Sequence, residues 1–232
     1  MPSQTPSTRN RVTAALPCAL LTGFDAFGGA ALNPSWLAVQ ALDGLTLAGH
    51  SLVAARLPTT FAGALPELIR LLRLHRPALV VCVGQAGGRQ ALSLERIAIN
   101  ISDSALADNA GVQPLDVPVV AGGPAAYFST LPIKAMLHDL QQAGVAAEVS
   151  QTAGTFVCNH VFYGLMHALA RQRRANAAPG QPRARGGFIH VPYLPEQVAD
   201  DGGPSMPLGE VVRGLRVAIA CALGDLESAG GV

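Results

Sequence analysis

The residues Ala78-Leu-Val-Val-Cys-Val-Gly84 are the clearest indication of the fold class. Its apolar residues run without a polar interruption and are rich in valine, which is typical of a strand covered on both faces. Before it, residues 60–75 carry leucines at helical spacing, and Pro77 marks the end of that helix. A buried strand that follows an amphipathic helix predicts an α/β protein.

Other stretches repeat this alternation. Strands are expected at Cys18–Thr22, Thr46–Leu57, Leu92–Ile101, Val145–Ser150 and Gly187–Val191, and helices at 34–44, Ile133–Ala143, 155–174 and Leu208–Leu226. Asn33 and Pro34 supply an N-cap and a proline at the first helical position. We therefore predict a single domain over residues 15–232, a mainly parallel twisted sheet with helices on both faces (phosphorylase/hydrolase-like). Residues 1–14 are expected to be a disordered extension, residues 175–185 a mobile loop, and a long polar loop is expected through Gly123.

Composition narrows the class of partner. Half of the residues are hydrophobic and 13% are charged, which suits a large buried core. The formal net charge of +1 gives no electrostatic reason to expect nucleic acid or an anionic membrane as partner. The apolar run at residues 12–21 is short for a signal peptide and contains Pro17, and no run is long enough to span a bilayer. We expect a cytoplasmic protein that acts on a small molecule or a peptide.

The cysteines divide into two kinds. Cys18, Cys82 and Cys221 lie in apolar runs and are expected to be buried small hydrophobes. Cys158 lies among small and polar residues instead. Free thiols, and hence a reducing compartment, are the prediction.

The segment Ser150-Gln-Thr-Ala-Gly-Thr-Phe-Val-Cys-Asn159 places Cys158 near the start of a helix, after a strand and a turn of small residues. The free amides and the dipole of a helix start favour thiolate, so we expect a lowered pKa for Cys158. The same amides could stabilise an oxyanion. A structural cysteine in the first helical turn is the alternative, and position does not separate the two.

The segment Phe188-Ile-His-Val-Pro-Tyr-Leu-Pro195 places His190 at the end of an apolar strand. A lone histidine there is more often structural than catalytic. The remaining histidines are poorer partners for Cys158, because they lie on the far side of its helix, on outer helices or on a strand without other reactive groups: His50, His75, His138, His160 and His167.

The segment Leu92-Ser-Leu-Glu-Arg-Ile-Ala-Ile-Asn100 places Glu95 on the same strand face as Ile97 and Ile99. A carboxylate on an apolar face needs a partner. An ion pair with Arg89 or Arg96 is one explanation, and a hydrogen bond that orients the ring of His190 is the other.

Two glycine-rich loops follow strands, at residues 23–29 and 84–89. Neither matches a P-loop or a dinucleotide-binding motif, so an enzyme that handles phosphate or nucleosides is a weaker alternative. Phe24 and Phe27 suit the wall of a small apolar pocket. No spacing of His, Cys and carboxylate residues predicts a metal site, and no cofactor is expected.

In combination, these segments resemble the pyroglutamyl peptidase type I family, also called pyrrolidone-carboxylate peptidases. The resemblance runs from Ala19 to Leu226 and includes residues 22–29, 33–35, 84–100, 108–114, 150–159 and 188–197 in order. It implies a cysteine exopeptidase that removes N-terminal pyroglutamate through a thioester. The implied catalytic residues are Cys158 as nucleophile, His190 as base and Glu95.

The resemblance also implies substrate-binding residues: Phe24, Phe27, Phe156 and Val157 around the pyroglutamyl ring and Gln85 at its lactam. One departure is Ala105, because the family usually has an arginine ten residues after the glutamate. A family member with weak or lost catalysis that binds a lactam or peptide is therefore the alternative function. The family resemblance also makes a homo-oligomer an expectation.

Overall fold

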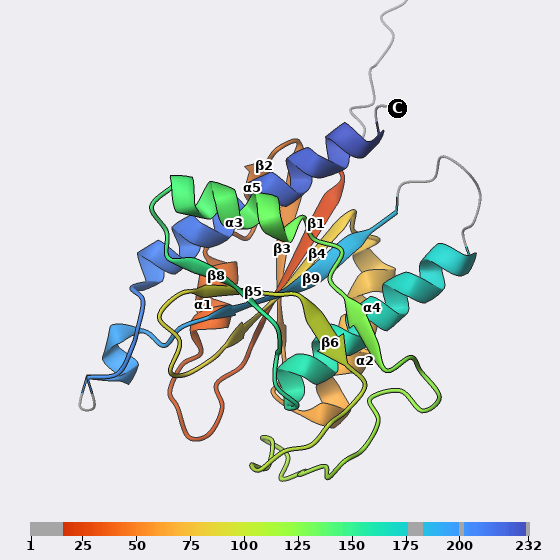
Figure 1. Ribbon diagram of the computed structural model, residues 1–232, viewed down its shortest axis with the longest axis vertical. Helices are drawn as coiled ribbons and strands as arrows, with labels where there is room; N and C mark the ends of the chain where they lie inside the picture. The colour runs from red at the N-terminus through yellow and green to blue at the C-terminus, as the bar shows by residue number, and fades with distance from the viewer. Residues whose placement is uncertain (1–15, 176–182, 200–201, 231–232) are drawn as a thin grey trace, which may run out of the picture.

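A seven-stranded sheet organises the chain, in the order β2-β3-β1-β4-β9-β5-β8 (Figure 1). The computed structural model describes residues 16–175, 183–199 and 202–230, with side chains as far as residue 226. The predicted extension at residues 1–14 and most of the predicted loop at residues 175–185 lie outside the described residues. Arg185 is not part of that loop, because it begins strand β9 and pairs with Leu79.

Four neighbouring strands run parallel: β3 (His50–Leu57), β1 (Cys18–Phe24), β4 (Leu79–Gln85) and β9 (Arg185–Val191). The strands β5 (Leu92–Glu95) and β8 (Ala147–Ser150) are parallel to each other but antiparallel to β9. The edge strand β2 (Thr46–Leu47) is antiparallel to β3. The mainly parallel sheet is therefore confirmed, with a reversed pair of strands beside β9.

Two expected strands are each divided. The expected strand at 46–57 is a hairpin, because Ala48 and Gly49 form a turn with φ angles of 42° and 68°. The expected strand at 92–101 ends at Glu95, and β6 (Ile97–Ile99) leaves the main sheet to pair with β7 (Ala126–Phe128). Arg96 marks the break, since its amide bonds to Ser150 and its carbonyl to Ser129. Glu95 therefore does not share a continuous strand face with Ile97 and Ile99, and that prediction was wrong.

Helices cover both faces of the sheet, as predicted (Figure 1). One face carries α1 (Pro34–Gln40), α3 (Ile133–Gln142) and α5 (Leu208–Gly230), and the other carries α2 (Phe61–His75) and α4 (Val157–Ala175). Asn33 and Thr60 cap α1 and α2 by accepting backbone N–H bonds. A short 3-10 helix, η1 (Pro195–Gln197), follows β9. Within the described residues, no helix is both long and apolar enough to cross a bilayer.

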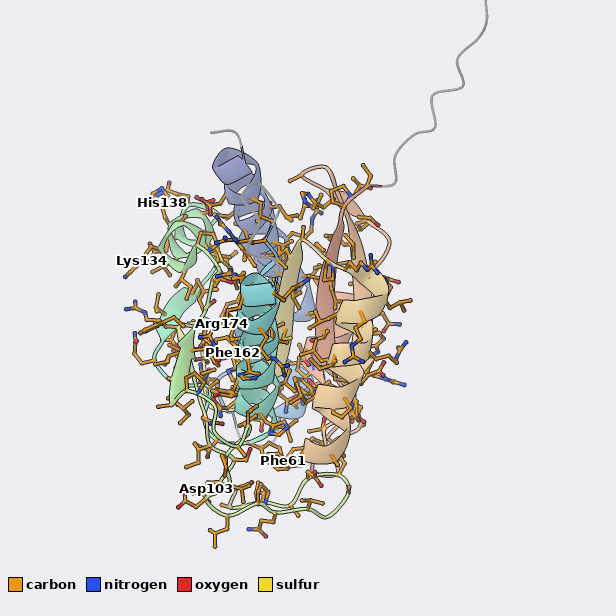
Figure 2. The ribbon with its side chains drawn as sticks, turned by 90° about the vertical axis from the view of Figure 1, so that its right-hand side faces the viewer. Phe61, Asp103, Lys134, His138, Phe162 and Arg174 are labelled. Carbon is orange, nitrogen blue, oxygen red and sulfur yellow. The ribbon has the colours of Figure 1, made fainter. Side chains whose placement is uncertain are left out.

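The helices α2 and α4 begin at the same end of the molecule. Figure 2 shows Phe61, at the start of α2, near the loop of Asp103, while Arg174 lies toward the other end of α4. The strands β1 and β3 also end on this side, where Asp25 bonds to the Leu57 carbonyl and to Thr59. Residues at strand ends and helix starts therefore meet there.

Candidate active site

Cys158 is the second residue of α4. The first bond of this helix runs from the His160 amide to the Phe156 carbonyl, so the amides of Val157, Cys158 and Asn159 precede the helical ladder. The helix start is held in place by the side chain of Asn159, which is fully buried and bonds to backbone groups of the 99–101 segment. Cys158 thus lies beside a row of backbone donors.

The sulfur of Cys158 lies directly over Gly84 of β4. A Cβ placed on Gly84 would be 2.9 Å from the Cys158 Sγ and 2.7 Å from the Phe188 ring. Gly84 is the register partner of His190 on the adjacent strand β9, and the side chains of paired residues point to the same face. Cys158 and His190 therefore lie on the same face of the sheet, where Gly84 leaves room for the thiol.

His190 is held by Glu95. Its Nδ1 lies 2.7 Å from Glu95 Oε1, and both side chains are buried. Glu95 reaches the ring from β5, which runs antiparallel to β9 and places Glu95 opposite Phe188. This bond fixes Nδ1 on Glu95, so Nε2 is the nitrogen left for a reacting group.

Arg89 bonds to the same carboxylate oxygen. Its Nη1 lies 2.8 Å from Glu95 Oε1. The two partners that the sequence offers for Glu95 as alternatives, Arg89 and His190, are thus both present. The side chain of Arg96, the other candidate, makes no hydrogen bond or ion pair with any described residue.

The expected lowering of the Cys158 pKa is wrong. Burial, assisted by the Glu95 carboxylate, raises the pKa of Cys158 to about 12, and Arg89 only partly opposes this. A helix terminus stabilises a charge by at most about 2 kcal/mol, or about 1.5 pH units at 1.36 kcal/mol per unit, which does not offset the burial. The resting thiol is therefore protonated.

Burial also lowers the pKa of His190, although Glu95 acts in the opposite direction. The imidazole is therefore neutral at pH 7 and can accept a proton through Nε2. A neutral thiol beside a neutral base, with a carboxylate behind the base, is an arrangement for proton transfer on attack.

Aromatic rings form a wall next to this group. The ring of Phe156 lies 5.0 Å from that of Phe27 and 5.3 Å from that of Phe61. Phe24 is buried against Phe188, with ring centres 6.4 Å apart, and Val157 is buried in the same core. Phe61 was not predicted here, because only the packing of α2 against α4 brings it to the wall.

The side chain of Gln85 lies away from Cys158, and the contact of Gln85 with the lactam stays a prediction. Strand alternation puts its side chain on the face opposite to that of Gly84 and Cys158. There its Oε1 accepts a bond from Gln197 Nε2, while Gln197 Oε1 accepts the amide of Leu194. Only the backbone of Gln85 can therefore face the aromatic wall.

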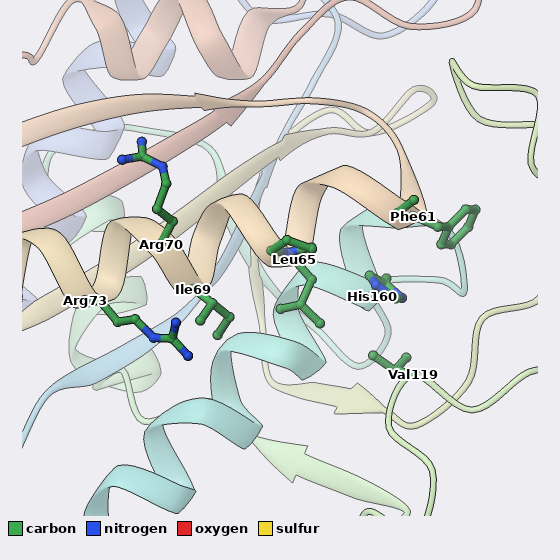
Figure 3. Close-up of a pocket in the computed structure, with 9 residues that line it drawn as sticks. Phe61, Leu65, Ile69, Arg70, Arg73, Val119 and His160 are labelled. Atoms are coloured by element: carbon green, nitrogen blue, oxygen red, sulfur yellow. The ribbon is translucent and has the colours of Figure 1, made fainter.

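The remaining candidates lie elsewhere. His160 contacts the Ser102 hydroxyl, and His167 contacts that of Tyr127, so neither reaches Cys158. A hollow of about 600 Å³ lies between α2 and α4 and is lined by His160 and Phe61 but by no member of the Cys158 group (Figure 3). All four cysteines are unpaired; Cys82 is buried as predicted, whereas Cys18 and Cys221 are only partly buried.

The sheet and this group of residues define the class, an α/β protein with a Cys–His–Glu arrangement of the kind used in covalent hydrolysis. A family model described as pyroglutamyl peptidase matches residues 18–225. The chain therefore belongs to the pyroglutamyl peptidase family.

Individual relatives agree with this assignment. The chain is 56% identical to pyrrolidone-carboxylate peptidase 1 of Ralstonia nicotianae, over 93% of this chain and 99% of that protein. The solved structure of pyroglutamyl peptidase I from Bacillus amyloliquefaciens superposes with a TM-score of 0.84 at 44% identity, over 90% of this chain and 95% of that one. A mutant pyrrolidone carboxyl peptidase from Pyrococcus furiosus gives a TM-score of 0.83 at 39% identity, over 90% and 99%.

Proposed function

We propose that this protein hydrolyses the peptide bond after an N-terminal pyroglutamyl residue, with Cys158 as nucleophile, His190 as base and Glu95 as the group that orients the base. The supporting observation is that the Cys158 sulfur lies over Gly84, the register partner of His190, whose ring is bonded to Glu95.

In the acylation step, the Cys158 sulfur attacks the pyroglutamyl carbonyl carbon while the thiol proton passes to His190 Nε2. The amides at the start of α4, which precede the first helical hydrogen bond, stabilise the oxyanion. Ala105 is exposed and its side chain offers no donor, so we assign that role to the backbone amides. The tetrahedral intermediate collapses, the carbon–nitrogen bond breaks, and His190 gives its proton to the leaving amine.

In the deacylation step, water attacks the thioester and gives a proton to His190. The carbon–sulfur bond then breaks, pyroglutamate leaves, and the proton returns to Cys158. Glu95 stabilises the imidazolium in both steps, because its Oε1 lies against Nδ1. No cofactor takes part in this scheme.

We place the pyroglutamyl ring of the substrate at the end of the sheet where β1 and β4 are no longer paired. The β1–β4 ladder ends at Thr22 and Cys82, although the strands continue to Phe24 and Gln85. We propose that the lactam bonds to the backbone edge near Gln85 that lies beyond the β1–β4 pairing, with Phe24, Phe27, Phe156 and Val157 as apolar surroundings. Such a polar edge would reject rings that leave its groups unpaired.

The surroundings of the protein are part of the proposal. Four unpaired thiols support a reducing compartment such as the cytoplasm. A homo-oligomer stays a prediction, which analytical ultracentrifugation can test.

Two peptides that differ only in the first ring test the substrate. We expect release of the free amine from a pyroglutamyl peptide and none from the matching prolyl peptide, which lacks the lactam carbonyl. Equal cleavage of both peptides, or of neither by folded and reduced protein, would contradict the proposal.

A further inference from the structure

Arg89 connects three parts of the site. It lies in the loop between β4 and β5, and its guanidinium makes two bonds. Nη1 donates to Glu95 Oε1 at 2.8 Å, and Nη2 donates to the Thr152 carbonyl at 3.3 Å. Thr152 belongs to the turn that leads into the helix of Cys158. One planar side chain therefore joins the carboxylate of the triad to the segment that carries the nucleophile.

Glu95 needs this second donor. Its side chain is 0% exposed, and Oε1 accepts from both His190 and Arg89. Its other oxygen, Oε2, is buried without a hydrogen-bond partner among the described residues. A buried carboxylate in this state is costly unless a cation offsets its charge, and the adjacent neutral imidazole does not supply one.

We propose that Arg89 is a positioning residue for the proposed peptidase reaction: its guanidinium holds the Glu95 carboxylate against His190, and it ties the turn at Thr152 to the Cys158, His190 and Glu95 group. The guanidinium suits both tasks, because its fork can hold two acceptors that a single ammonium cannot hold at once. The inference rests on the proposed function, but its geometry is independent of the substrate.

The charges around His190 give this role a measurable signature. Glu95 contacts the ring from β5 and Arg89 acts on it from the preceding loop, and Cys158 is acted on by these two groups and by Cys82 of β4. Glu95 acts to raise the pKa of both His190 and Cys158, and Arg89 acts to lower both. Without Arg89, both groups would hold their protons to higher pH.

The test compares Arg89→Gln with Arg89→Lys and with Arg96→Gln. Arg96→Gln is the matched control, because it removes an arginine charge next to Glu95 in sequence that has no partner among the described residues. The first readout is the pH dependence of kcat/KM on a pyroglutamyl-amide reporter. The second is the pH dependence of Cys158 alkylation by iodoacetamide, which needs no turnover.

For Arg89→Gln we expect the acidic limb of the kcat/KM profile, where activity rises as His190 loses its proton, to move up by about one pH unit or more. At a pH below the limb, kcat/KM then falls about tenfold. The alkylation profile should move in the same direction. Arg89→Lys should keep the limb near its wild-type position but lower kcat, because the bond to Thr152 is lost. Arg96→Gln should match the wild type in both readouts.

An Arg89→Gln protein with unmoved kcat/KM and alkylation profiles would overturn the inference, whatever its kcat. If Arg89→Gln does not fold, Arg89→Lys provides the test. An acidic limb of kcat/KM that moves up by about one pH unit in Arg89→Lys, although the positive charge is kept, would also overturn the inference. If the wild type does not cleave the reporter but Arg89→Gln still shifts the alkylation profile of Cys158, the peptidase proposal is refuted and the role of Arg89 is supported.

Discussion

Cys158 shows how local position and burial compete at a single residue. The start of α4 supplies amides that favour a thiolate, but the partly buried Cys158 packs against the core that contains Phe188 and lies near the charge of Glu95. The second effect is larger, so the nucleophile rests as a thiol and depends on His190 to lose its proton. Residue type and position predicted which cysteine to choose, whereas its protonation depends on neighbours from other strands.

Alkylation tests this resting state. Because the pKa of Cys158 is raised to about 12, reaction with iodoacetamide should rise about tenfold per pH unit from pH 7 to pH 10 without a plateau. Peptide mapping by mass spectrometry distinguishes Cys158 from the partly buried Cys18 and Cys221, and Cys158→Ala provides the background. A plateau reached below pH 8 would show a stable thiolate and contradict the account.

At the scale of elements, helix ends were easier to predict than strand ends. The cap at Asn33 and the leucine spacing of residues 60–75 are read from local residues, and the structure confirms both helices. The break at Arg96 was not predictable in this way, because it depends on bonds to Ser150 and Ser129. The antiparallel direction of β5 was not predictable from local residues either, and the approach of Glu95 to His190 depends on it.

Gly84 tests the contact between β4 and α4. A Cβ at this position would lie 2.9 Å from the Cys158 sulfur, so Gly84→Ala must displace the thiol or the strand. We expect kcat/KM to fall by about 100-fold and the free energy of unfolding to fall by about 1–3 kcal/mol.

Gly209→Ala in α5 is the matched control, since a Cβ there would have no atom within 4 Å. Its activity should equal that of the wild type. Full activity of a folded Gly84→Ala protein would mean that the thiol does not work from the position over Gly84.

At the scale of the whole molecule, one sheet supports two cores. Consecutive residues of β1 belong to different cores: Leu20 packs under α2 and α4, and Leu21 packs under α1 and α5. Every central strand contributes to both cores in this way. The two-sided sheet was predictable from apolar runs such as 78–83, and the comparison structures share it over 90% of this chain.

This arrangement predicts cooperative unfolding. Leu20→Ala and Leu21→Ala should each lower the free energy of unfolding by about 2–5 kcal/mol, because both side chains are fully buried. Urea titrations followed by circular dichroism and by tryptophan fluorescence should give coincident single transitions for both variants. Separate transitions for the two probes would mean that the cores unfold independently.

Nucleophilic attack by Cys158 is tested by amine release from a pyroglutamyl-amide reporter by wild type and by Cys158→Ala, at matched concentration and with thermal unfolding recorded for both. We expect steady release by the wild type and none above background by a Cys158→Ala protein that is folded. Release by Cys158→Ala at a rate near that of the wild type would contradict this role, because the bond would then be cleaved without the Cys158 thiol.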